Sequence, residues 1–453
     1  MQLILKNINL IQDARIRLNG LTVIAGENDS GKSTVGKLLF SIIKAFSQYD
    51  KSLSEDKIIN IQEQIENIYR QVRKTFRFED NPGLKEIFFP TNFFQSIRKI
   101  IEFTAAPYQA DEIKTIFDKK AQLLESATPL SEEHHNVTNI QQDIKILSKR
   151  ILKLLADDTV GERIRPVLNR ILASEFNNEL IPKHSEERQA HIALSEGDNA
   201  ILALTIDTHG VQHLEISDPL LFNDASFIET PIILQLYDLI NTAHTLPGDS
   251  FGLKGSHARL PYHLADLISK LKNAQYVSDS LMDGDEPLFA ALQNTHALMR
   301  GGFNFDDSDK DFIFRRGYGQ EQSMNIKPVN TASGIKAFGI IQLLIHAGML
   351  NTKSLLIVDE PETHLHPAWQ VEYARLMIML VQQGIPVLLT SHSPYIIQAL
   401  KVAGEAEGLG AKMNYYLAEC EPDGFASMHD VSNDLNRIFV KLSAPMQELV
   451  WQQ

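Results

Sequence analysis

The residues best suited to chemistry lie at 26–34, where the chain reads GENDSGKST and matches G-x-x-x-x-G-K-[ST] at every fixed position. Small residues in such a loop let phosphate oxygens approach the backbone N–H groups and the N-terminus of the following helix. We therefore predict that Lys32 lies along the β- and γ-phosphates of a nucleotide and that the Ser33 hydroxyl completes a Mg²⁺ shell. A glycine-rich turn that only caps a helix is the alternative. The residues predicted to contact the nucleotide are Gly26, Glu27, Asn28, Asp29, Ser30, Gly31, Lys32, Ser33 and Thr34.

A pair of carboxylates ends the apolar run LLIVDEPE. Burying an unpaired charge is costly, so we expect Asp359 and Glu360 at the open edge of a sheet, where a cation compensates them. Asp359 is predicted to hold Mg²⁺ directly or through water, and Glu360 to accept a proton from an attacking water. The alternative is an acidic exit from a strand that does no chemistry.

Three histidines accompany these carboxylates. His392, in LLTSHSPY, follows a second apolar strand, so we predict that it emerges at the same sheet edge and either donates to the γ-phosphate or positions the attacking water. A core histidine with satisfied hydrogen bonds is the alternative. His364 and His366 in THLHP could share a metal ion, but neither a cysteine nor a third histidine nearby completes a zinc set. We favour loop contacts across a dimer interface for these two.

The elements that must position these residues follow from periodicity. Residues 1–25 alternate apolar and polar positions and predict strands, whereas 35–43 have helical spacing, so the loop lies between strand and helix. After residue 300, apolar strands alternate with helices. This order predicts an α/β fold with a mainly parallel sheet flanked by helices. Short strands at about 188–217 add a small antiparallel β subdomain.

The middle of the chain is more polar and mostly helical. Apolar residues step by three and four along a seam that predicts a short helical arm or bundle, with amphipathic helices that cap a core as the alternative. We divide the chain into an N-terminal lobe at 1–50, an insertion at 51–300 and a C-terminal lobe at 301–453. The seam is formed by Ile58, Ile61, Ile65, Ile68 and Val72.

Composition narrows the class of protein. A chain of 453 residues exceeds the usual size of one hydrophobic core, and its formal charge of -14 does not predict general attraction to nucleic acid, although 73–77 and 162–170 are candidate basic patches. The single cysteine, Cys420, fits a reducing cytoplasm. The longest apolar stretch, 339–350, is shorter than the ~20 residues that span a bilayer, and the start lacks a leader. We expect a cytoplasmic protein.

Taken together, GENDSGKST, ASGIKAF, LLIVDEPETHLHP and LLTSHSP resemble the ABC-type ATPase heads of the RecF/SMC and OLD-nuclease groups of AAA-family ATPases. The match extends over about 1–50 and 300–453. The resemblance implies a P-loop NTPase of ABC-head type with ATP and Mg²⁺ as cofactors, and two heads that sandwich ATP. It gives Ser333, Gly334 and Lys336 the signature role in trans, although Ile335 replaces the usual second glycine. No glutamine is assigned to the Q-loop.

The resemblance also predicts partners. The chain is similar to the ATPase subunits of Septu-type anti-phage systems, which implies a slow ATPase that forms homodimers or higher oligomers and controls a separate HNH-type nuclease. Fewer residues follow His392 than the nuclease domain of an OLD protein needs. The alternatives are a RecF-like or SMC-like ATPase that clamps DNA and, less in keeping with the long insertion, the nucleotide-binding subunit of a membrane transporter.

Overall fold

The computed structural model divides the chain into two compact units, each described by itself below. Unit 1 comprises Met1–Ser47 and Ile164–Gln453, and unit 2 comprises Gln48–Arg163. The boundaries between these compact units therefore follow residues 47 and 163. The division into two lobes and an insertion at 51–300 stays a prediction. The structure describes all residues except 80, 104–105, 126, 128–133, 157–159, 178, 183–187, 198, 241–259, 276–285, 307, 319–321, 423 and 452–453.

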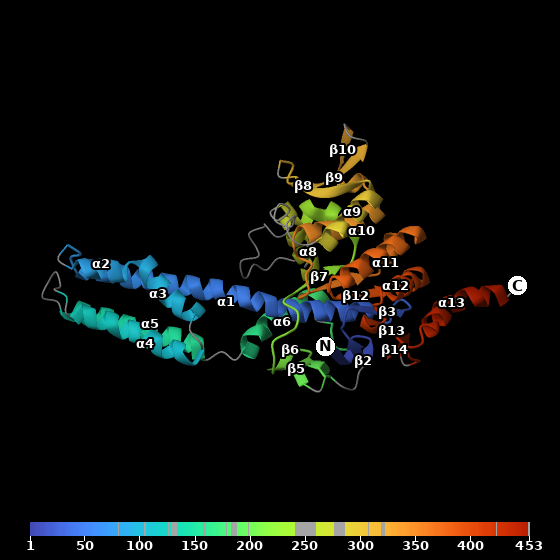
Figure 1. Ribbon diagram of the computed structural model, residues 1–453. Helices are drawn as coiled ribbons and strands as arrows, with labels where there is room; N and C mark the ends of the chain where they lie inside the picture. The colour runs from blue at the N-terminus through green and yellow to red at the C-terminus, as the bar shows by residue number, and fades with distance from the viewer. Residues whose placement is uncertain are drawn as a thin grey trace. The chain divides into compact units, whose positions relative to one another are not determined.

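Unit 1 is built on a mixed sheet whose described strands run in the order β6-β5-β4-β1-β2-β14-β13-β3-β12-β11-β7. The strands β7, β11, β12, β3 and β13 are parallel to one another, and β2, β1, β4, β5 and β6 form an antiparallel block. The sheet and its covering helices confirm the predicted α/β class, with a larger antiparallel part than expected (Figure 1). The strands are β1 (Gln2–Ile8), β2 (Ile11–Arg17), β3 (Leu21–Gly26), β4 (Ala190–Glu196), β5 (Asn199–Asp207), β6 (Gly210–Ile216), β7 (Asp224–Ile228), β11 (Ser354–Asp359), β12 (Val387–Ser391), β13 (Met413–Cys420) and β14 (Ala426–Asp430).

The burial of each strand explains its place in the sheet. Every residue of β3, β11 and β12 is buried, as expected for parallel strands that are covered on both faces. In β2, by contrast, buried and exposed residues alternate in part, which fits a strand with one solvated face. The apolar runs LTVIAG and SLLIVD therefore form interior strands, each with a neighbouring strand on both sides. Their last residues lie at the carboxyl edge of the sheet.

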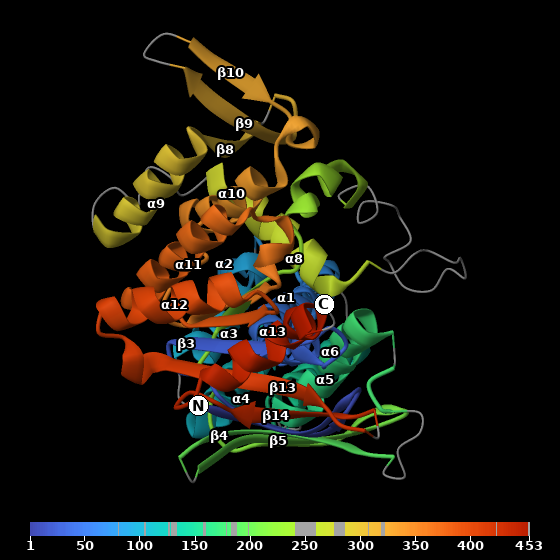
Figure 2. The same ribbon diagram turned by 90° about the vertical axis from the view of Figure 1, so that its right-hand side faces the viewer.

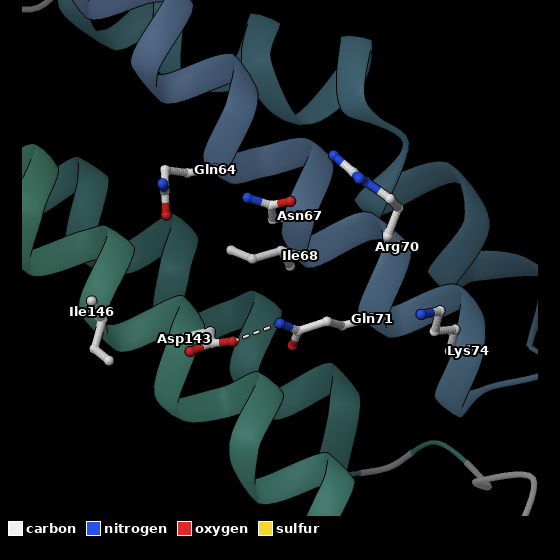
Figure 3. Close-up of a pocket in the computed structure, with 8 residues that line it drawn as sticks. All are labelled: Gln64, Asn67, Ile68, Arg70, Gln71, Lys74, Asp143 and Ile146. Carbon is white, nitrogen blue, oxygen red and sulfur yellow. Dashed lines mark hydrogen bonds between the residues drawn. The ribbon is translucent and has the colours of Figure 1, made fainter.

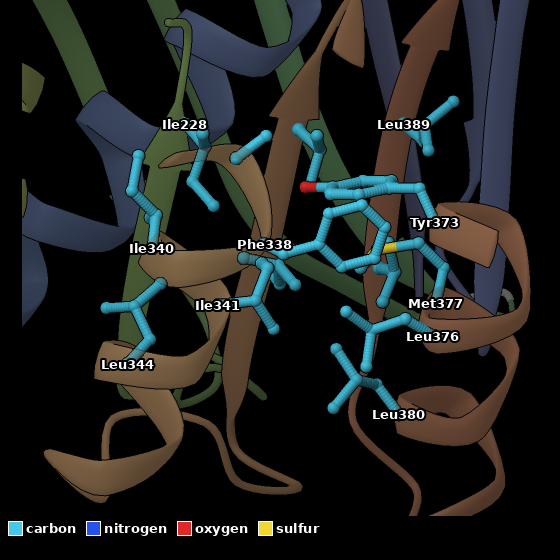
Figure 4. Packing of buried hydrophobic residues seen from close by; sticks show 14 of the residues in the cluster. Ile228, Phe338, Ile340, Ile341, Leu344, Tyr373, Leu376, Met377, Leu380 and Leu389 are labelled. Carbon is cyan, nitrogen blue, oxygen red and sulfur yellow. The ribbon is translucent and has the colours of Figure 1, made fainter. Parts of the chain in front are cut away.

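Helices α10, α11 and α12 cover one face of the parallel strands (Figure 2). Phe338 of α10 packs edge-on against Tyr373 of α11 with ring centroids 5.2 Å apart, and Leu389 of β12 belongs to the same core (Figure 4). The helices that lie wholly within this unit are α8 (Tyr262–Lys272), α9 (Glu286–Met299), α10 (Ser333–His346), α11 (Pro367–Gln382), α12 (Pro394–Ala406) and α13 (Asn436–Trp451), with short 3₁₀ helices η1 (Pro231–Leu236), η2 (Asn273–Gln275), η4 (Pro328–Asn330), η5 (Pro361–His364) and η6 (Gly410–Lys412).

The first part of α1 (Lys32–Thr75) lies against the opposite face of the parallel strands. A β-carbon at Gly36 would lie 2.8 Å from the Phe227 ring and 2.9 Å from the Ile357 side chain. Glycine at this position therefore lets the helix approach β7 and β11 closely. The helix that follows the phosphate loop is thereby fixed directly beneath the strands that carry the carboxylates.

The short strands predicted at about 188–217 are β4, β5 and β6, which belong to the main sheet through the pairing of β1 with β4. A separate, smaller antiparallel sheet is formed by β8 (Gly301–Asp306), β9 (Asp311–Tyr318) and β10 (Gln322–Ile326). A small antiparallel subdomain is thus present, although it lies later in the chain than the sequence predicted.

Unit 2 is helical and has a hydrophobic core of its own. Its helices are the remainder of α1, α2 (Pro82–Phe88), α3 (Pro90–Phe103), α4 (Ala106–Glu125), α5 (His134–Ala156) and the start of α6 (Val160–Phe176). Ile65, Ile68 and Val72 of the predicted seam are buried in this core. The side chains of Ile58 and Ile61, and residues 241–259 and 276–285 of the predicted insertion, lie outside the described residues. No helix in the described part of the chain is both long and apolar enough to cross a membrane.

Candidate functional site

The phosphate loop connects the end of β3 to the start of α1, as the sequence predicted. Gly31 has a φ of +77°, and a β-carbon there would lie 2.8 Å from Ile11, so any larger residue would strain the turn and clash. The loop forms one wall of a cavity of about 400 Å³. The residues that line it are Asn9, Leu10, Asn28, Asp29, Ser30, Gly31, Lys32, Ser33, Thr34 and Glu360.

Lys32 is buried, and its ammonium group is folded back onto the loop. Nζ donates to the carbonyl oxygens of Gly26 at 3.1 Å and Glu27 at 2.6 Å, and it lies 3.4 Å from Oε1 of Glu360. These partners hold a positive charge at the base of the cavity. A phosphate oxygen would be a further partner for the same ammonium, so the geometry fits an anionic ligand.

Ser33 and Asp359 meet although 326 residues separate them. The Ser33 hydroxyl donates to Oδ1 of Asp359 at 3.0 Å, and the Thr390 hydroxyl donates to the same oxygen at 2.5 Å. Burial raises the pKa of Asp359, and Glu360 and Glu229 raise it further, while the two hydrogen bonds partly oppose the shift. Within the described residues, no lysine, arginine or histidine forms an ion pair with Asp359. A hydroxyl and an uncompensated carboxylate are the oxygen ligands that Mg²⁺ takes, so these residues fit the ion.

Glu360 follows β11 in a left-handed backbone conformation, with φ 44° and ψ 56°. This conformation is uncommon and costly for a residue with a β-carbon, and such residues cluster at functional sites. The Glu360 N–H donates to the carbonyl oxygen of Thr390 at 3.2 Å and to its hydroxyl at 3.1 Å, which holds the turn in place. The turn leaves the carboxylate partly exposed at the cavity, as a proton acceptor for water requires.

His392 lies at the same edge, beside a carboxylate that the sequence analysis had not singled out. Its Nδ1 atom is 3.5 Å from Oε1 of Glu360 and 3.3 Å from Oε1 of Glu362. Glu362 is buried, and one of its oxygens accepts from the Ser391 hydroxyl at 2.8 Å and from the N–H groups of His392 at 2.5 Å and Ser393 at 3.1 Å. Burial raises the pKa of Glu362 despite these hydrogen bonds. Glu362 therefore fixes the loop that carries His392.

The residues predicted for the signature role lie apart from this cavity. Ser333 and Gly334 begin α10, and Lys336 of the next turn is buried, with Nζ donating to Oε1 of Gln235 at 2.7 Å. Burial lowers the pKa of Lys336. Among the described residues, the wall of the phosphate-loop cavity includes none of the three. Their contact with a nucleotide bound to a second head stays a prediction.

The two histidines of THLHP have separate local roles. Nδ1 of His366 accepts from the Ala368 N–H at 3.3 Å and so caps α11, while Nε2 of His364 is 3.5 Å from the Thr230 hydroxyl. Burial, and then the charge of Lys336, lower the pKa of His364. In the part of the chain that the structure describes, no group of three or more His, Cys, Asp or Glu side chains has the arrangement of a metal site.

Unit 2 contains a second cavity, of about 440 Å³, between α1 and α5 (Figure 3). Gln71 donates to Asp143 at 2.8 Å across it, and Ile68 and Ile146 contribute apolar surface. Arg70 and Lys74 lie at its rim on α1. The cavity holds none of the predicted site residues, so the phosphate-loop cavity is the candidate functional site.

Comparisons with known proteins agree with the class of site. Residues 256–398 match the family model described as "AAA domain, putative AbiEii toxin, Type IV TA system". This segment covers about a third of the chain and contains the ASGIKAF stretch, Asp359, Glu360 and His392, so this part of the chain is similar to an AAA domain. No curated protein matches the chain.

Several solved structures are similar over nearly the whole chain. The SMC head domain from Thermotoga maritima is 11% identical, with 95% of this chain and 98% of that chain covered and a TM-score of 0.37. An SmcHead bound to the C-winged helix domain of ScpA is 9% identical, with 96% and 98% covered and a TM-score of 0.41. The Smc head domain with an extended coiled coil bound to the C-terminal domain of ScpA, derived from Pyrococcus furiosus, is 10% identical, with 97% and 98% covered and a TM-score of 0.41.

Proposed function

We propose that this protein binds ATP with Mg²⁺ in the phosphate-loop cavity and hydrolyses it slowly. The observation that carries the proposal is the meeting of Ser33 and Asp359 beside Lys32 and Glu360, because these residues supply a metal-ligand pair, a phosphate-binding cation and a general base at one cavity. When bound, Mg²⁺ supplies positive charge that neutralises phosphate oxygens.

Each protein group has a separate task in this proposal. The loop N–H groups and Lys32 bind the phosphate oxygens, and Ser33 and Asp359 would hold the metal ion. Glu360 takes the proton of the attacking water, which its exposed carboxylate can reach. His392, held by Glu362, donates a hydrogen bond to the terminal phosphate or orients the water.

Equilibrium binding tests the first step. Titration of the purified chain with a fluorescent ATP analogue should give saturable binding that requires Mg²⁺, followed by slow release of phosphate in a coupled assay. An analogue that does not bind at millimolar concentration, with the protein folded by circular dichroism, would overturn the proposal. Binding with no phosphate release over hours would remove hydrolysis while it keeps the nucleotide site.

We further propose that ATP controls a partner protein. In the family this chain resembles, PtuA of the Septu system is an ATPase subunit of an anti-phage complex with a separate HNH-type nuclease. This resemblance is what supports a head that controls the activity of another protein. Affinity purification of the tagged chain from its own operon, with and without Mg-ATP, tests this role. Co-purification of a small nuclease is expected, and recovery of the chain alone in both conditions would oppose it.

The composite ATP site of a homodimer or higher oligomer has its own test. If Ser333 acts on the nucleotide of the second head, a mixture of Ser333→Ala and Lys32→Ala chains should recover part of the ATPase activity, since one composite site stays whole. The control is each variant alone at the same total concentration. No recovery at any mixing ratio would remove the trans role from Ser333.

DNA clamping is the second candidate, and exposed cations on unit 2 favour it. Arg70, Arg73 and Lys74 are exposed along one stretch of α1, within a chain of otherwise acidic charge. A clamp would bind duplex DNA only with ATP, and its affinity would fall steeply between 50 and 200 mM salt as phosphate contacts are lost. Binding that disappears in a variant with alanine at these three positions would support the clamp over the nuclease-control role.

A further inference from the structure

A series of ion pairs, partly exposed at Lys37 and Glu229 and buried at His263 and Glu175, leads away from the candidate site through α8. Nδ1 of His263 lies 2.7 Å from Oε2 of Glu175 on α6, and Nε2 lies 3.1 Å from Oε2 of Glu229. The other Glu229 oxygen is 3.2 Å from Nζ of Lys37 on α1. The Glu175 carboxylate also accepts from the His263 N–H at 2.8 Å. Four charged residues from α1, α6, α8 and the end of β7 therefore form one connected series.

Two members of this series, Glu229 and Lys37, lie beside the candidate nucleotide site. Glu229 directly follows β7, whose last residue Ile228 pairs with Val358, so Glu229 is the register neighbour of Asp359 at the carboxyl edge. Its charge contributes to the raised pKa of Asp359. Lys37 is four residues after Ser33, on the same face of α1. A displacement of Glu229 would therefore change the field at the proposed metal ligands.

The other two members, His263 and Glu175, are completely shielded from solvent. The side chains of His263 and Glu175 have no exposed surface, and both ring nitrogens face a carboxylate. A neutral imidazole has only one N–H, so two carboxylate partners require the charged ring. With that ring charged, the series holds two cations and two anions. Loss of His263 would leave the buried carboxylate of Glu175 without its cation, which is costly.

We propose that His263 is a positioning residue that holds Glu229 at the nucleotide site and ties it to α6, so that the affinity for Mg-ATP depends on the contact between α6 and α8. This inference rests on the proposed ATPase function. Along the chain, α1 and α6 are the helices that cross the division between the two units. A shift of α6 at Glu175 reaches Glu229 through a single side chain, and this gives a partner that moves α6 a direct route to the site.

The test is the Mg²⁺ concentration that half-saturates binding of a fluorescent ATP analogue, measured at equilibrium and not through turnover. Glu229→Gln removes a negative charge next to Asp359, and we expect the half-saturating concentration to rise about 5- to 10-fold, within the range of known coupling energies. Glu175→Gln, which lies beyond His263, should raise it about 3-fold. In the double variant Glu175→Gln/Glu229→Gln the two effects should not add, because Glu175 acts on the metal ligands only through the Glu229 carboxylate.

Asp224→Asn is the matched control. Asp224 also pairs with a lysine of α1, but it lies at the opposite end of β7, so this variant should lose stability and keep the wild-type Mg²⁺ dependence. If Glu175→Gln does not fold, Glu175→Asp retracts the carboxylate by one methylene and should produce a smaller rise in the same direction.

The outcomes separate two failures. A wild-type chain that binds no Mg-ATP overturns the ATPase proposal and this inference together. Wild-type binding combined with an unchanged half-saturating concentration in both Glu175 variants overturns only the positioning role of His263, which would then serve packing alone.

Discussion

Two clusters of carboxylates lie at opposite ends of the same parallel strands, and they differ in how their charge is balanced. At the carboxyl edge of β11, Asp359 receives hydrogen bonds from hydroxyl groups, and burial raises its pKa. At the other end, Asp224 begins β7 beside Ser354, the first residue of β11. Lysine side chains surround Asp224, and they hold its pKa below the usual value despite burial.

The cluster around Asp224 is closed. Lys44 lies 2.7 Å from Asp224 and 2.6 Å from Asp266, and Lys270 lies 2.7 Å and 3.1 Å from the same two residues. Burial lowers the pKa of Lys44, but the two aspartates outweigh it and raise the value overall. Two cations and two anions balance one another's charge, so this cluster needs no added cation and links α1, β7 and α8.

The charge balance alone, without any motif, indicates a structural role for the Asp224 cluster and a chemical role for the Asp359 cluster. Asp359 is buried and Asp224 is half-buried on the adjacent strand, yet of the two only Asp359 has no ion-pair partner within the described residues. A carboxylate that folding leaves uncompensated has a free-energy cost that a bound cation removes. The edge cluster is therefore the one expected to respond to Mg²⁺ and nucleotide.

The sharpest test of this division is Glu360→Gln, which should lower the hydrolysis rate by roughly 10²- to 10⁴-fold because the amide does not accept a proton from water. Nucleotide binding should persist, since the phosphate loop and Lys32 are unchanged. Single-turnover phosphate release and analogue binding measure the two effects separately. Glu372→Gln on the exposed surface of α11 is the matched control and should hydrolyse ATP like the wild type. Normal turnover in Glu360→Gln would remove this residue from the general-base role.

The closed cluster should respond in the opposite way. Asp224→Asn leaves Lys44 and Lys270 with one carboxylate between them, and breaking such a buried network costs about 3–5 kcal/mol of unfolding free energy. Nucleotide affinity should stay within twofold of the wild type. Urea unfolding measures the loss, with Asp430→Asn as control, since the exposed pair between Arg17 and Asp430 contributes at most about 1 kcal/mol. A stable Asp224→Asn with impaired nucleotide binding would contradict the comparison.

The sequence predicts the edge cluster much better than the closed one, for a physical reason. Asp359 ends an apolar strand, and Lys32 and His392 come after two others of the same sheet. Because parallel strands end at one edge of a sheet, local sequence patterns are enough to predict that these residues meet. Asp224 and Lys44 are 180 residues apart and belong to no motif. Their pairing depends on how closely Gly36 lets α1 approach β7, which periodicity does not report.

Other features were missed for related reasons. Glu362 lies inside the quoted DEPETH stretch, and its position two residues after Glu360 was the available signal for a role at the site. The strands at 188–217 were recognised, but their membership of the main sheet depends on pairing between β1 and β4, which are far apart in the chain. Long-range pairing is the part of a fold that local propensity specifies least.

A smaller effect is expected at the cation of the edge cluster. Lys32→Ala removes the ammonium from the base of the cavity and should weaken ATP analogue binding roughly 10- to 100-fold, the value of a charge-assisted hydrogen bond to phosphate. Equilibrium titration measures it. Lys412→Ala, an exposed lysine in η6, serves as the matched control and should bind like the wild type. Wild-type affinity in Lys32→Ala would mean that the loop does not hold the phosphates.

The smallest expected effect is a pH dependence of the free energy of unfolding. It comes from His263, which pairs with Glu229 at the carboxyl edge of the sheet and with Glu175 on α6. Burial lowers the pKa of His263, but the hydrogen bonds to Glu175 and Glu229 outweigh it, so the folded value is raised above the ordinary 6.5. The stability that this ring contributes is therefore complete below about pH 6.5 and is lost as the pH rises through the folded value. Glu229 stays ionised across this window, since the hydrogen bond from His263 holds its pKa at about 2.

Urea unfolding from pH 6 to pH 9 measures this loss in the wild type and in His263→Gln. The wild-type free energy of unfolding should fall over this range, and the slope should be shallower in the variant, whose amide does not titrate. Asp224→Asn should keep the wild-type slope at a lower overall stability, because Asp224 pairs with Lys44 and Lys270 and not with His263. Equal slopes in the wild type and His263→Gln would show that the ring is neutral in the folded protein, and the two clusters would then differ less in charge balance than their geometry indicates.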